Sequence, residues 1–521
     1  KSLFLSTLEH YYDINAREDF QKLFGALYIG KNPTVFRNQY LILKMNFSGL
    51  NTSSKEELKQ SFHLRVLDSI VNFLNIYSNF FTNILTIKEK IEDTDDTGSA
   101  LIKIIDAVKT TGKKIYLIID EYDHFANDII AMGEKDFYKD IVRASGFVRD
   151  FYKTVKIGTE SVIDRIFITG ISPIMLDDLT SGFNIAMNIT MDQELNEMLG
   201  FTREEVSGIC DKLGIDQTEI DIKIKEYYDG YLFHPEGNER LYNPYMMLYF
   251  LDQYIRKKRM PERLIDDNVK MDYGRLNRLT VNKENKKMLE KIIQDESITS
   301  DIVTRFSFDR MYDQDYFISL LFYMGLLTID RKERTRLVLK IPNYVIKTVF
   351  WEYIADSLKK DHGIKIDTTQ LKKAIEDMAY NGTIEPFITY VSQNILKSLS
   401  NRDMIDFDEK YIKVILLSLL NISPVYIPVS EREVETGYID IYLERDMRTP
   451  DVKYEWILEL KYIKKNENQR PDFAQYIEKI KAEGQEQLDR YKTSRRLENK
   501  KDLKQALLIF IGKDKYEIVG K

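Results

Sequence analysis

The spacing of apolar residues predicts an α/β fold for the first 200 residues. Two short and strongly apolar runs, 114–120 and 165–170, are bounded by charged or glycine-containing turns. Such runs are typical of strands that are buried on both faces of a parallel sheet. Segments 57–89 and 137–156 have helical periodicity. We therefore expect residues 1–200 to form a parallel sheet with crossover helices.

The pattern changes twice further along the chain. Residues 201–365 lack such runs and follow helical periodicity, which predicts a helical lid or linker region. Residues 366–521 predict a compact α/β module in which helices are followed by a strand hairpin, a charged helix and a last strand. The elements expected there are helices 371–399 and 408–420, and strands 438–443, 454–462 and 505–511.

Composition narrows the class of protein. The chain of 521 residues is 43% hydrophobic and 31% charged, as expected of a folded soluble protein with two to four domains. Its one cysteine, Cys210, permits no internal disulfide, which favours a reducing, cytoplasmic location. No run approaches the ~18 apolar residues that a membrane span needs, so we expect no membrane partner.

Charge alone gives no general attraction to nucleic acid, because the formal net charge is -7. The last segment differs, since residues 461–521 contain 16 Lys and Arg against 10 Asp and Glu. A solvated, lysine-rich surface explains this excess as well as a nucleic-acid surface does. The five histidines show no zinc-ligand spacing, so a metal site has to rest on carboxylates.

Acidic and polar residues follow the two apolar runs of the N-terminal part. Asp120 and Glu121 end the first run, as in a Walker B strand. There the Asp would hold Mg²⁺ and the Glu would orient the attacking water. Thr169 and Ser172 follow the second run and could sense a γ-phosphate. Solvated acids and turn-capping residues are the alternatives.

A third element of a nucleotide site stands at the start of the sequence. Lys1 and Ser2 precede an amphipathic helix, as the Lys-Ser pair of a phosphate loop does, although the glycines of that motif are not among these residues. In a complete loop the Lys binds phosphate and the hydroxyl binds Mg²⁺. Arg143, Arg149 and Arg165 are all eligible as an arginine finger, and the sequence selects none of them.

A second constellation lies in the predicted C-terminal hairpin. Asp440 is on one strand, while Glu459 and Lys461 stand two residues apart on the other and therefore share a face. Two carboxylates and a cation are what metal-dependent phosphodiester cleavage requires. A salt-bridged surface hairpin is the alternative.

Three further residues could support this constellation. Gln487 and Tyr491 lie four apart on one face of the following helix. Glu409 opens an apolar helix and could supply a third carboxylate, although an acid in a first helical turn is also favourable without any ligand.

Together these segments resemble the bacterial family that joins an AAA-ATPase-like domain to a PD-(D/E)XK nuclease-superfamily domain, over essentially the whole chain. The resemblance rests on 1–8, 118–123, 167–173, 228–231, 242–244, 437–440 and 458–461. It implies a P-loop NTPase (AAA-like) sheet, a restriction-endonuclease-like module, and a strand and glycine loop before Lys1. The nuclease name expects Pro-Asp, whereas this chain has Ile439-Asp440.

The resemblance also implies roles for individual residues. Lys1 and Ser2 would bind phosphate and Mg²⁺ of ATP, and Asp120 with Glu121 would be the Walker B pair. The nuclease core would be Asp440, Glu459 and Lys461, supported by Glu409, Gln487 and Tyr491.

The leading hypothesis is a nucleotide-regulated nuclease that uses Mg²⁺ or Mn²⁺ to cleave DNA, with RNA kept open as a substrate. ATP binding or hydrolysis would gate the nuclease, and defence against mobile elements is a plausible role. The first alternative is an ATP-dependent switch whose nuclease-like domain only binds a partner or nucleic acid. The second is a degenerate ATPase that serves as a scaffold. By analogy with related ATPases, we consider a homo-oligomer possible.

Overall fold

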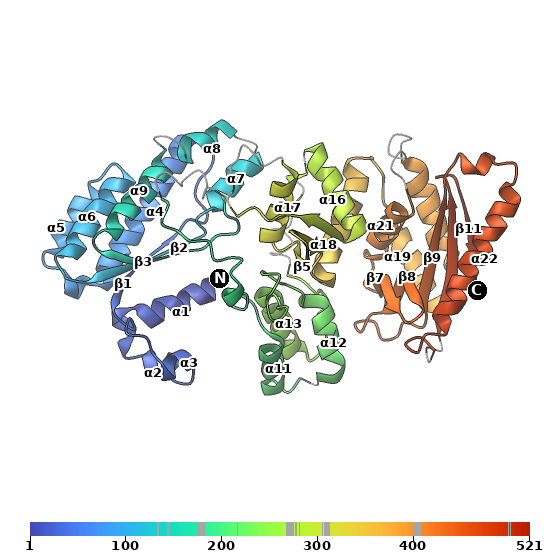
Figure 1. The fold of residues 1–521 in the computed structure, drawn as a ribbon, viewed down its shortest axis with the longest axis horizontal. Helices are drawn as coiled ribbons and strands as arrows, with labels where there is room; N and C mark the ends of the chain where they lie inside the picture. Colours follow the sequence, from blue (N-terminus) through green and yellow to red (C-terminus); the bar gives the residue numbers. More distant parts are fainter. Residues whose placement is uncertain are drawn as a thin grey trace.

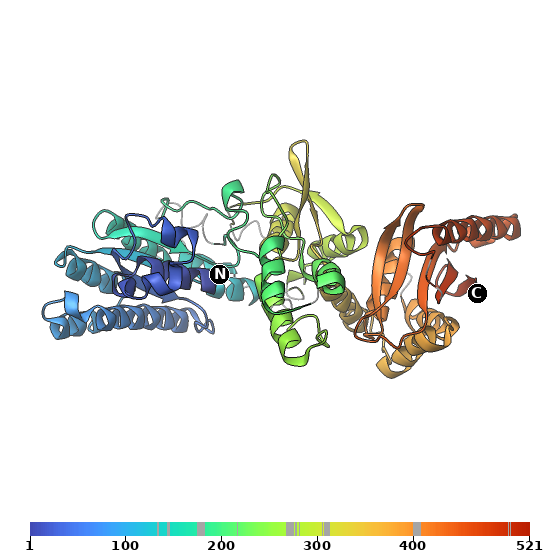
Figure 2. The same ribbon diagram turned by 90° about the horizontal axis from the view of Figure 1, so that it is seen from below.

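The fold is an elongated row of three bodies, seen in a computed structural model (Figures 1 and 2). The N-terminal body is blue to teal in these views, the middle body is green to yellow, and the C-terminal body is orange to red. The structure describes residues 1–132, 135–142, 146–174, 183–215, 217–266, 276, 279–280, 282–304, 306, 313–399, 408–498, 500 and 502–520.

A three-stranded parallel sheet organises the N-terminal body, as the sequence predicted. Its order is β1-β2-β3, from β1 (Tyr40–Asn46), β2 (Lys114–Asp120) and β3 (Ile163–Ile168). Residues that alternate along β1 and β2 enter two separate cores. One core lies under helices α4 (Lys55–Ile76), α6 (Thr97–Lys109) and α9 (Phe147–Thr159), and the other lies under α1 (Ser2–Tyr12). Both faces of the sheet are thus covered, which explains the apolar runs.

Two of the longer helices of this body begin after capping residues. The first helix of the 57–89 segment starts after Ser54, whose hydroxyl accepts from the Glu57 N–H at 3.2 Å. Another starts after Asp96, whose carboxylate accepts from the Ser99 N–H at 2.9 Å. The helices are α1 (Ser2–Tyr12), α2 (Phe20–Phe24), α3 (Tyr28–Lys31), α4 (Lys55–Ile76), α5 (Ile84–Glu92), α6 (Thr97–Lys109), α7 (His124–Met132), α8 (Lys135–Val142) and α9 (Phe147–Thr159).

The middle body is mainly helical, as predicted, but it also contains a small antiparallel sheet that the sequence analysis did not predict. The sheet has the order β4-β6-β5, from β4 (Ser297–Ser300), β5 (Thr328–Glu333) and β6 (Arg336–Lys340). The helices are α11 (Arg203–Lys212), α12 (Gln217–Tyr228), α13 (Pro244–Lys257), α16 (Lys283–Asp295), α17 (Gln314–Tyr323) and α18 (Tyr344–Lys360).

A five-stranded sheet forms the C-terminal body, with the order β11-β10-β9-β8-β7. Strands β9 and β10 are parallel and the other neighbours are antiparallel. The predicted hairpin and last strand are present, whereas the two edge strands were not predicted. The strands are β7 (Tyr426–Val434), β8 (Gly437–Arg445), β9 (Glu455–Ile463), β10 (Leu503–Ile511) and β11 (Lys515–Val519).

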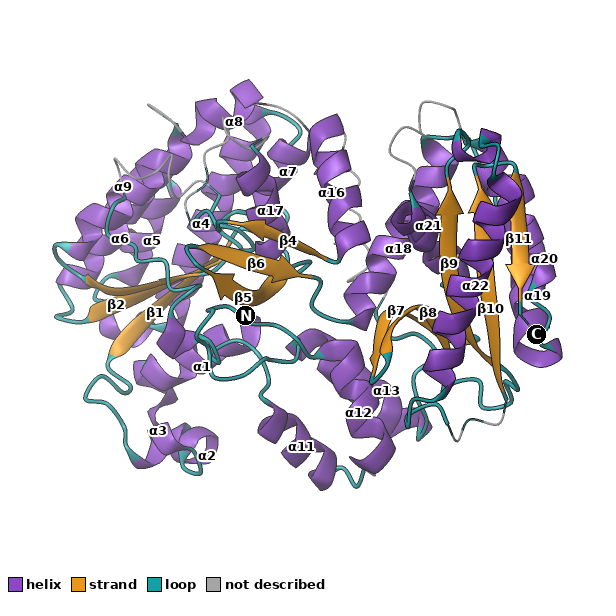
Figure 3. Ribbon diagram, turned by 45° about the vertical axis from the view of Figure 1, so that its right-hand side comes forward, coloured by secondary structure: helices purple, strands orange, loops and turns teal. Residues whose placement is uncertain are grey.

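Helices cover both faces of this sheet (Figure 3). One face packs on α22 (Phe473–Lys492) through its own small core. The other face packs on α19 (Thr368–Glu376), α20 (Glu385–Tyr390) and α21 (Glu409–Leu420). The side-chain alternation along β9 therefore sends Leu458 and Leu460 to one core and leaves Glu459 and Lys461 on the α22 side.

The hydrophobic cores do not follow the boundaries of the three bodies. One core runs without interruption from the middle body into the C-terminal sheet. Helix α17 contributes Phe317 and Leu321 to that core, and Tyr316 and Leu320 to the core of the N-terminal body. The middle body is thus packed against both neighbours. None of the helices in the described ranges combines the length and hydrophobicity of a membrane span.

Candidate nucleotide and nuclease sites

Three polar side chains meet at the carboxyl ends of the parallel strands, where ligands bind in open α/β sheets. Asp120 ends β2 and is only 5% exposed. Its Oδ1 accepts from the Thr169 hydroxyl at 2.6 Å and its Oδ2 from the Asn46 amide at 3.4 Å. Asn46 was missed by the sequence analysis, although the apolar run of β1 that ends on it was a usable signal.

Lys1 and Glu121 lie at the same edge. The Lys1 ammonium is 3.2 Å from Glu121 Oε1 and donates to the Gly170 carbonyl at 3.0 Å. Ser2 is exposed as the first residue of α1. Glu121 has a positive φ of 52°, a conformation that non-glycine residues rarely adopt outside functional sites and tight turns. The structure thus brings together Lys1, Asp120, Glu121 and Thr169.

Ser172 is engaged differently from these residues. Its hydroxyl donates to Asp123 Oδ2 at 3.0 Å, and its N–H donates to the same oxygen at 2.8 Å. Asp123 is fully buried and also accepts from the Ile171 N–H. The carboxylate therefore fixes the loop after β3, while the contact of Ser172 with a nucleotide remains a prediction. Of the candidate arginine fingers, Arg143 lies outside the described residues.

The C-terminal site lies where β8 and β9 separate. The two strands pair at Ile441–Leu458, Tyr442–Ile457 and Leu443–Trp456. Beyond these pairs, Asp440 Oδ2 accepts from the Leu460 N–H at 2.8 Å, and the Glu409 carboxylate accepts from the Tyr462 N–H. Two carboxylates thus occupy backbone donors of β9 that would otherwise pair with a neighbouring strand.

Glu459 is the most deeply buried carboxylate of this group, at 2% exposure. Its Oε1 is 2.8 Å from the Lys461 ammonium and its Oε2 is 3.3 Å from the Tyr491 hydroxyl. The same hydroxyl donates to the Tyr438 carbonyl at 2.6 Å. Gln487 lies one turn before Tyr491 on α22 and is half-buried. The predicted hairpin residues and Tyr491 are therefore one connected cluster.

Burial and crowding make these acids weak. The pKa of Glu459 is raised to about 7, first by its burial and then by the neighbouring charge of Asp440, against the opposing effect of Lys461. Burial also raises the pKa of Asp440, and the Leu460 N–H opposes this rise. The pKa of Glu409 is raised in the same way by burial. Ionisation of all three carboxyls would leave negative charge in excess of the neighbouring ammonium groups of Lys461 and Lys413.

A divalent cation fits this excess of negative charge. Within the described ranges, no three His, Cys, Asp or Glu side chains are arranged as a group that could hold a metal ion. Mg²⁺ needs fewer than three protein ligands, because it is commonly bound through one or two carboxylates and keeps several waters. Asp440 and Glu459 supply two hard oxygen donors, and Glu409 lies close enough for its pKa to respond to the charge of Asp440.

A second lysine and a further acid of this site were not predicted from the sequence. Lys413 follows Glu409 by one turn of α21, is 6% exposed, and forms an ion pair with Glu431 of β7. A lysine inside the apolar run 411–417 was a signal that could have identified it. Glu431 offered no comparable signal.

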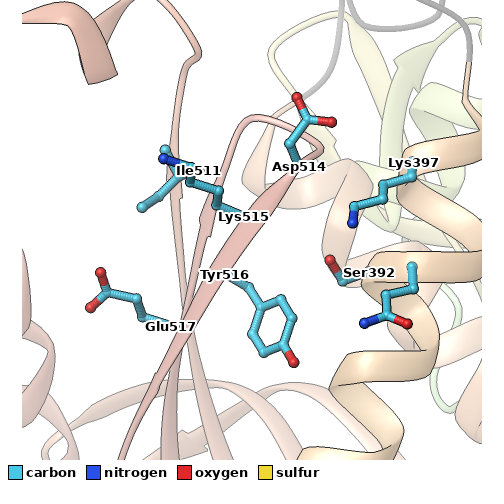
Figure 4. A pocket seen from close by; sticks show the side chains of 8 residues that line it. Ser392, Lys397, Ile511, Asp514, Lys515, Tyr516 and Glu517 are labelled. Atoms are coloured by element: carbon cyan, nitrogen blue, oxygen red, sulfur yellow. The ribbon is translucent and has the colours of Figure 1, made fainter.

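A separate hollow of about 350 Å³ lies between residues 391–398 and the β10–β11 hairpin (Figure 4). Its lining is mostly polar and mixed in charge, with Lys397 and Lys515 opposed by Asp514 and Glu517. The predicted site residues are not among those that line it, so this hollow does not extend the nuclease cluster.

Fold and site together define a chain that combines an ATPase-type α/β body with a nuclease-type α/β body. Residues 1–180 match the family model described as predicted AAA-ATPase, and residues 407–518 match that of the PD-(D/E)XK nuclease superfamily. The resemblance seen in the sequence is thereby confirmed for both domains of the fusion.

Matches to whole proteins are fewer than the matches to family models. A solved Walker-type ATPase of Pyrococcus abyssi is similar over 64% of this chain and 94% of its own length, with 14% identity and a TM-score of 0.35. None of the curated proteins matches the chain.

Proposed function

We propose that the protein is a nucleotide-regulated nuclease that cleaves DNA phosphodiester bonds with Mg²⁺ or Mn²⁺. One observation carries this proposal: Asp440, Glu459 and Lys461 meet where β8 and β9 separate, beside a second helix that supplies Tyr491. The match of residues 407–518 to the nuclease superfamily supports the same reaction.

Each residue has a distinct role in this proposal. Asp440 and Glu459 would hold the divalent ion, with Glu409 as a further acid nearby. When bound, the ion would supply Lewis-acid stabilisation of the scissile phosphate. The Lys461 ammonium would stabilise the charge that develops on that phosphate or orient the attacking water. Tyr491, with Gln487 on the same helical face, would keep Glu459 in position.

The N-terminal body would bind and hydrolyse ATP. Lys1 and Ser2 would contact phosphate and its Mg²⁺, Asp120 would complete the metal shell, and Glu121 would orient water. Thr169 and Ser172 would respond to the γ-phosphate. The convergence of Lys1, Asp120, Glu121 and Thr169 at one sheet edge supports this assignment.

Further parts of the proposal concern the setting of the enzyme. The domains are taken as 1–200, 201–365 and 366–521, with a reducing cytoplasmic location and a role against mobile elements. A homo-oligomer would let neighbouring copies complete each other's ATPase sites, as happens in related ATPases.

Plasmid cleavage tests the nuclease directly. Supercoiled and single-stranded DNA are incubated with the full chain and Mg²⁺ or Mn²⁺, with and without ATP. We expect metal-dependent nicking that Lys461→Ala abolishes and that exposed Lys465→Ala leaves unchanged. An ATP effect would support coupling. Absence of cleavage of DNA and RNA under every condition would refute the proposed activity.

The alternative is an ATP-dependent switch whose nuclease-like domain only binds a partner. One observation favours the switch: the Lys461 ammonium and the Glu459 carboxylate already form an ion pair with each other. Metal binding that survives Asp440→Ala would support the switch, because the nuclease proposal requires this carboxylate as a ligand.

A further inference from the structure

Lys413 is a buried cation without an assigned role. It lies in the apolar middle of α21, between Ile412 and Val414, with 6% of its surface exposed. A buried ammonium is costly unless a counter-charge accompanies it. Glu431 provides that charge through a direct ion pair. The pair joins α21 to the edge strand of the nuclease sheet.

Glu431 has an unusual position. Its neighbours Ser430 and Arg432 pair with Ile441 and Ile439, so Glu431 stands opposite Asp440 on the adjacent strand. Like charges in directly opposed positions destabilise a sheet. Glu431 also has a positive φ of 50°, which is unfavourable for a residue with a side chain. Such strain persists where surrounding contacts hold it, and Lys413 is one of these contacts.

We propose that Lys413 is the internal counter-ion of the nuclease carboxylates and sets the metal concentration at which the site fills. This inference rests on the proposed nuclease function. A divalent ion that approaches Asp440 and Glu459 meets the positive charge of Lys413 nearby. Glu431 holds and partly neutralises that charge. Lys413 and Glu431 therefore act on metal affinity in opposite directions.

The charges around Asp440 agree with this arrangement. Lys413 and Lys461 both lower the pKa of the Asp440 carboxyl, with the effect of Lys413 the larger, and Glu431 raises it. Lys413 also acts on Glu409. The two lysines have different attachments, because Lys461 pairs with a proposed metal ligand whereas Lys413 pairs with Glu431.

Mn²⁺ binding by the full chain tests the inference without relying on activity. Binding is measured by calorimetry and by the Mn²⁺-induced rise in melting temperature, at pH 8.5. Removing one positive charge that acts on a divalent site should change the affinity of that site by about five- to tenfold. We expect Lys413→Met to lower the Mn²⁺ midpoint by that factor, and Glu431→Gln to raise it.

Two further variants serve as control and as safeguard. Lys410→Met removes an exposed lysine of the same helix, which pairs with Asp295 at 2.6 Å, and should leave the midpoint unchanged. Lys413→Met combined with Glu431→Gln removes the whole pair and should return the midpoint towards that of the wild type. If Lys413→Met does not fold, the Mn²⁺ midpoints of Glu431→Gln and of the double variant still test the inference.

The outcomes separate this inference from the proposed function. A wild-type chain that neither binds Mn²⁺ nor cleaves nucleic acid contradicts the function itself. If the wild type binds and cleaves, unchanged midpoints in Lys413→Met and Glu431→Gln overturn the inference alone. Shifts of both single variants in the same direction overturn it as well.

Discussion

Replacing Glu459 by glutamine should change how the stability of the metal-free protein depends on pH. The pKa of Glu459 is raised from an ordinary value near 4.5 to about 7 in the folded protein. The folded state therefore holds a proton that the unfolded state has already lost over this interval. Stability consequently falls as the pH rises from about 4.5 to about 7, and it stays low above this range.

The size of this loss follows from the shift. Each pKa unit corresponds to about 1.4 kcal/mol, so ionisation of Glu459 costs the folded state on the order of 3 kcal/mol. Glutamine avoids the charge but places an N–H₂ group where Lys461 and Tyr491 now approach the two oxygens. A mismatched donor costs about 1–3 kcal/mol. We therefore expect little net gain at pH 8 and a clear net loss at pH 5.

Thermal unfolding of the full-length wild type and of Glu459→Gln, in EDTA from pH 5 to pH 8, measures the difference. For unfolding of a domain of about 150–250 residues, 1 kcal/mol moves the melting temperature by about 2–4 °C. Groups outside this carboxylate cluster titrate alike in both proteins, so the difference should grow by several degrees in favour of glutamine as the pH rises. A difference that stays constant across this range would refute the reasoning. Mn²⁺ should stabilise only the wild type.

Three other changes test separate parts of the structure. Tyr491→Phe leaves the Tyr438 carbonyl without its donor and should cost about 1 kcal/mol in urea unfolding, with slower cleavage; unchanged values for both would remove Tyr491 from the site. Asp120→Asn should weaken Mg²⁺-dependent ATP binding by about tenfold or more in calorimetry, whereas equal affinity would count against the Walker B assignment. Lys223→Ala breaks a largely buried pair with Glu444 of β8 at 3.0 Å and should cost about 3 kcal/mol; a loss below 1 kcal/mol would show that this contact between α12 and the nuclease sheet is weak.

Local pattern was sufficient for the elements that carry the predicted site. Both faces of β2 are covered, so its sequence 114–120 is apolar throughout and predicted a buried strand. The acid at the end of this strand could be identified from the local sequence alone. The hairpin was predictable because apolar and polar residues alternate around Glu459. The middle strands were not predictable, since β5 and β6 are short and carry a charged turn at 332–336.

Side-chain contacts that depend on tertiary packing could not be predicted from the sequence. Ser172 was predicted to sense phosphate because it follows a strand, but its hydroxyl contacts Asp123, which lies 49 positions earlier in the chain. Glu431 stands opposite Asp440 only because of the β7–β8 register, and no local rule predicts that a glutamate adopts a positive φ. Lys413 was visible as a charge in an apolar helix, but its counter-ion was not.

The packing of the middle body limits how ATP could influence the nuclease. Helix α17 belongs to the core of the ATPase body and also to the core that continues into the nuclease sheet. Helix α18 packs on α21, which carries Glu409 and Lys413 to the nuclease site. A lid on a flexible linker would not make these contacts. Close-packed cores, in contrast, shift between discrete arrangements rather than deforming gradually. Movement of α17 would therefore reach the carboxylate cluster through helices in contact, because α17 contacts α16 and α16 contacts α21.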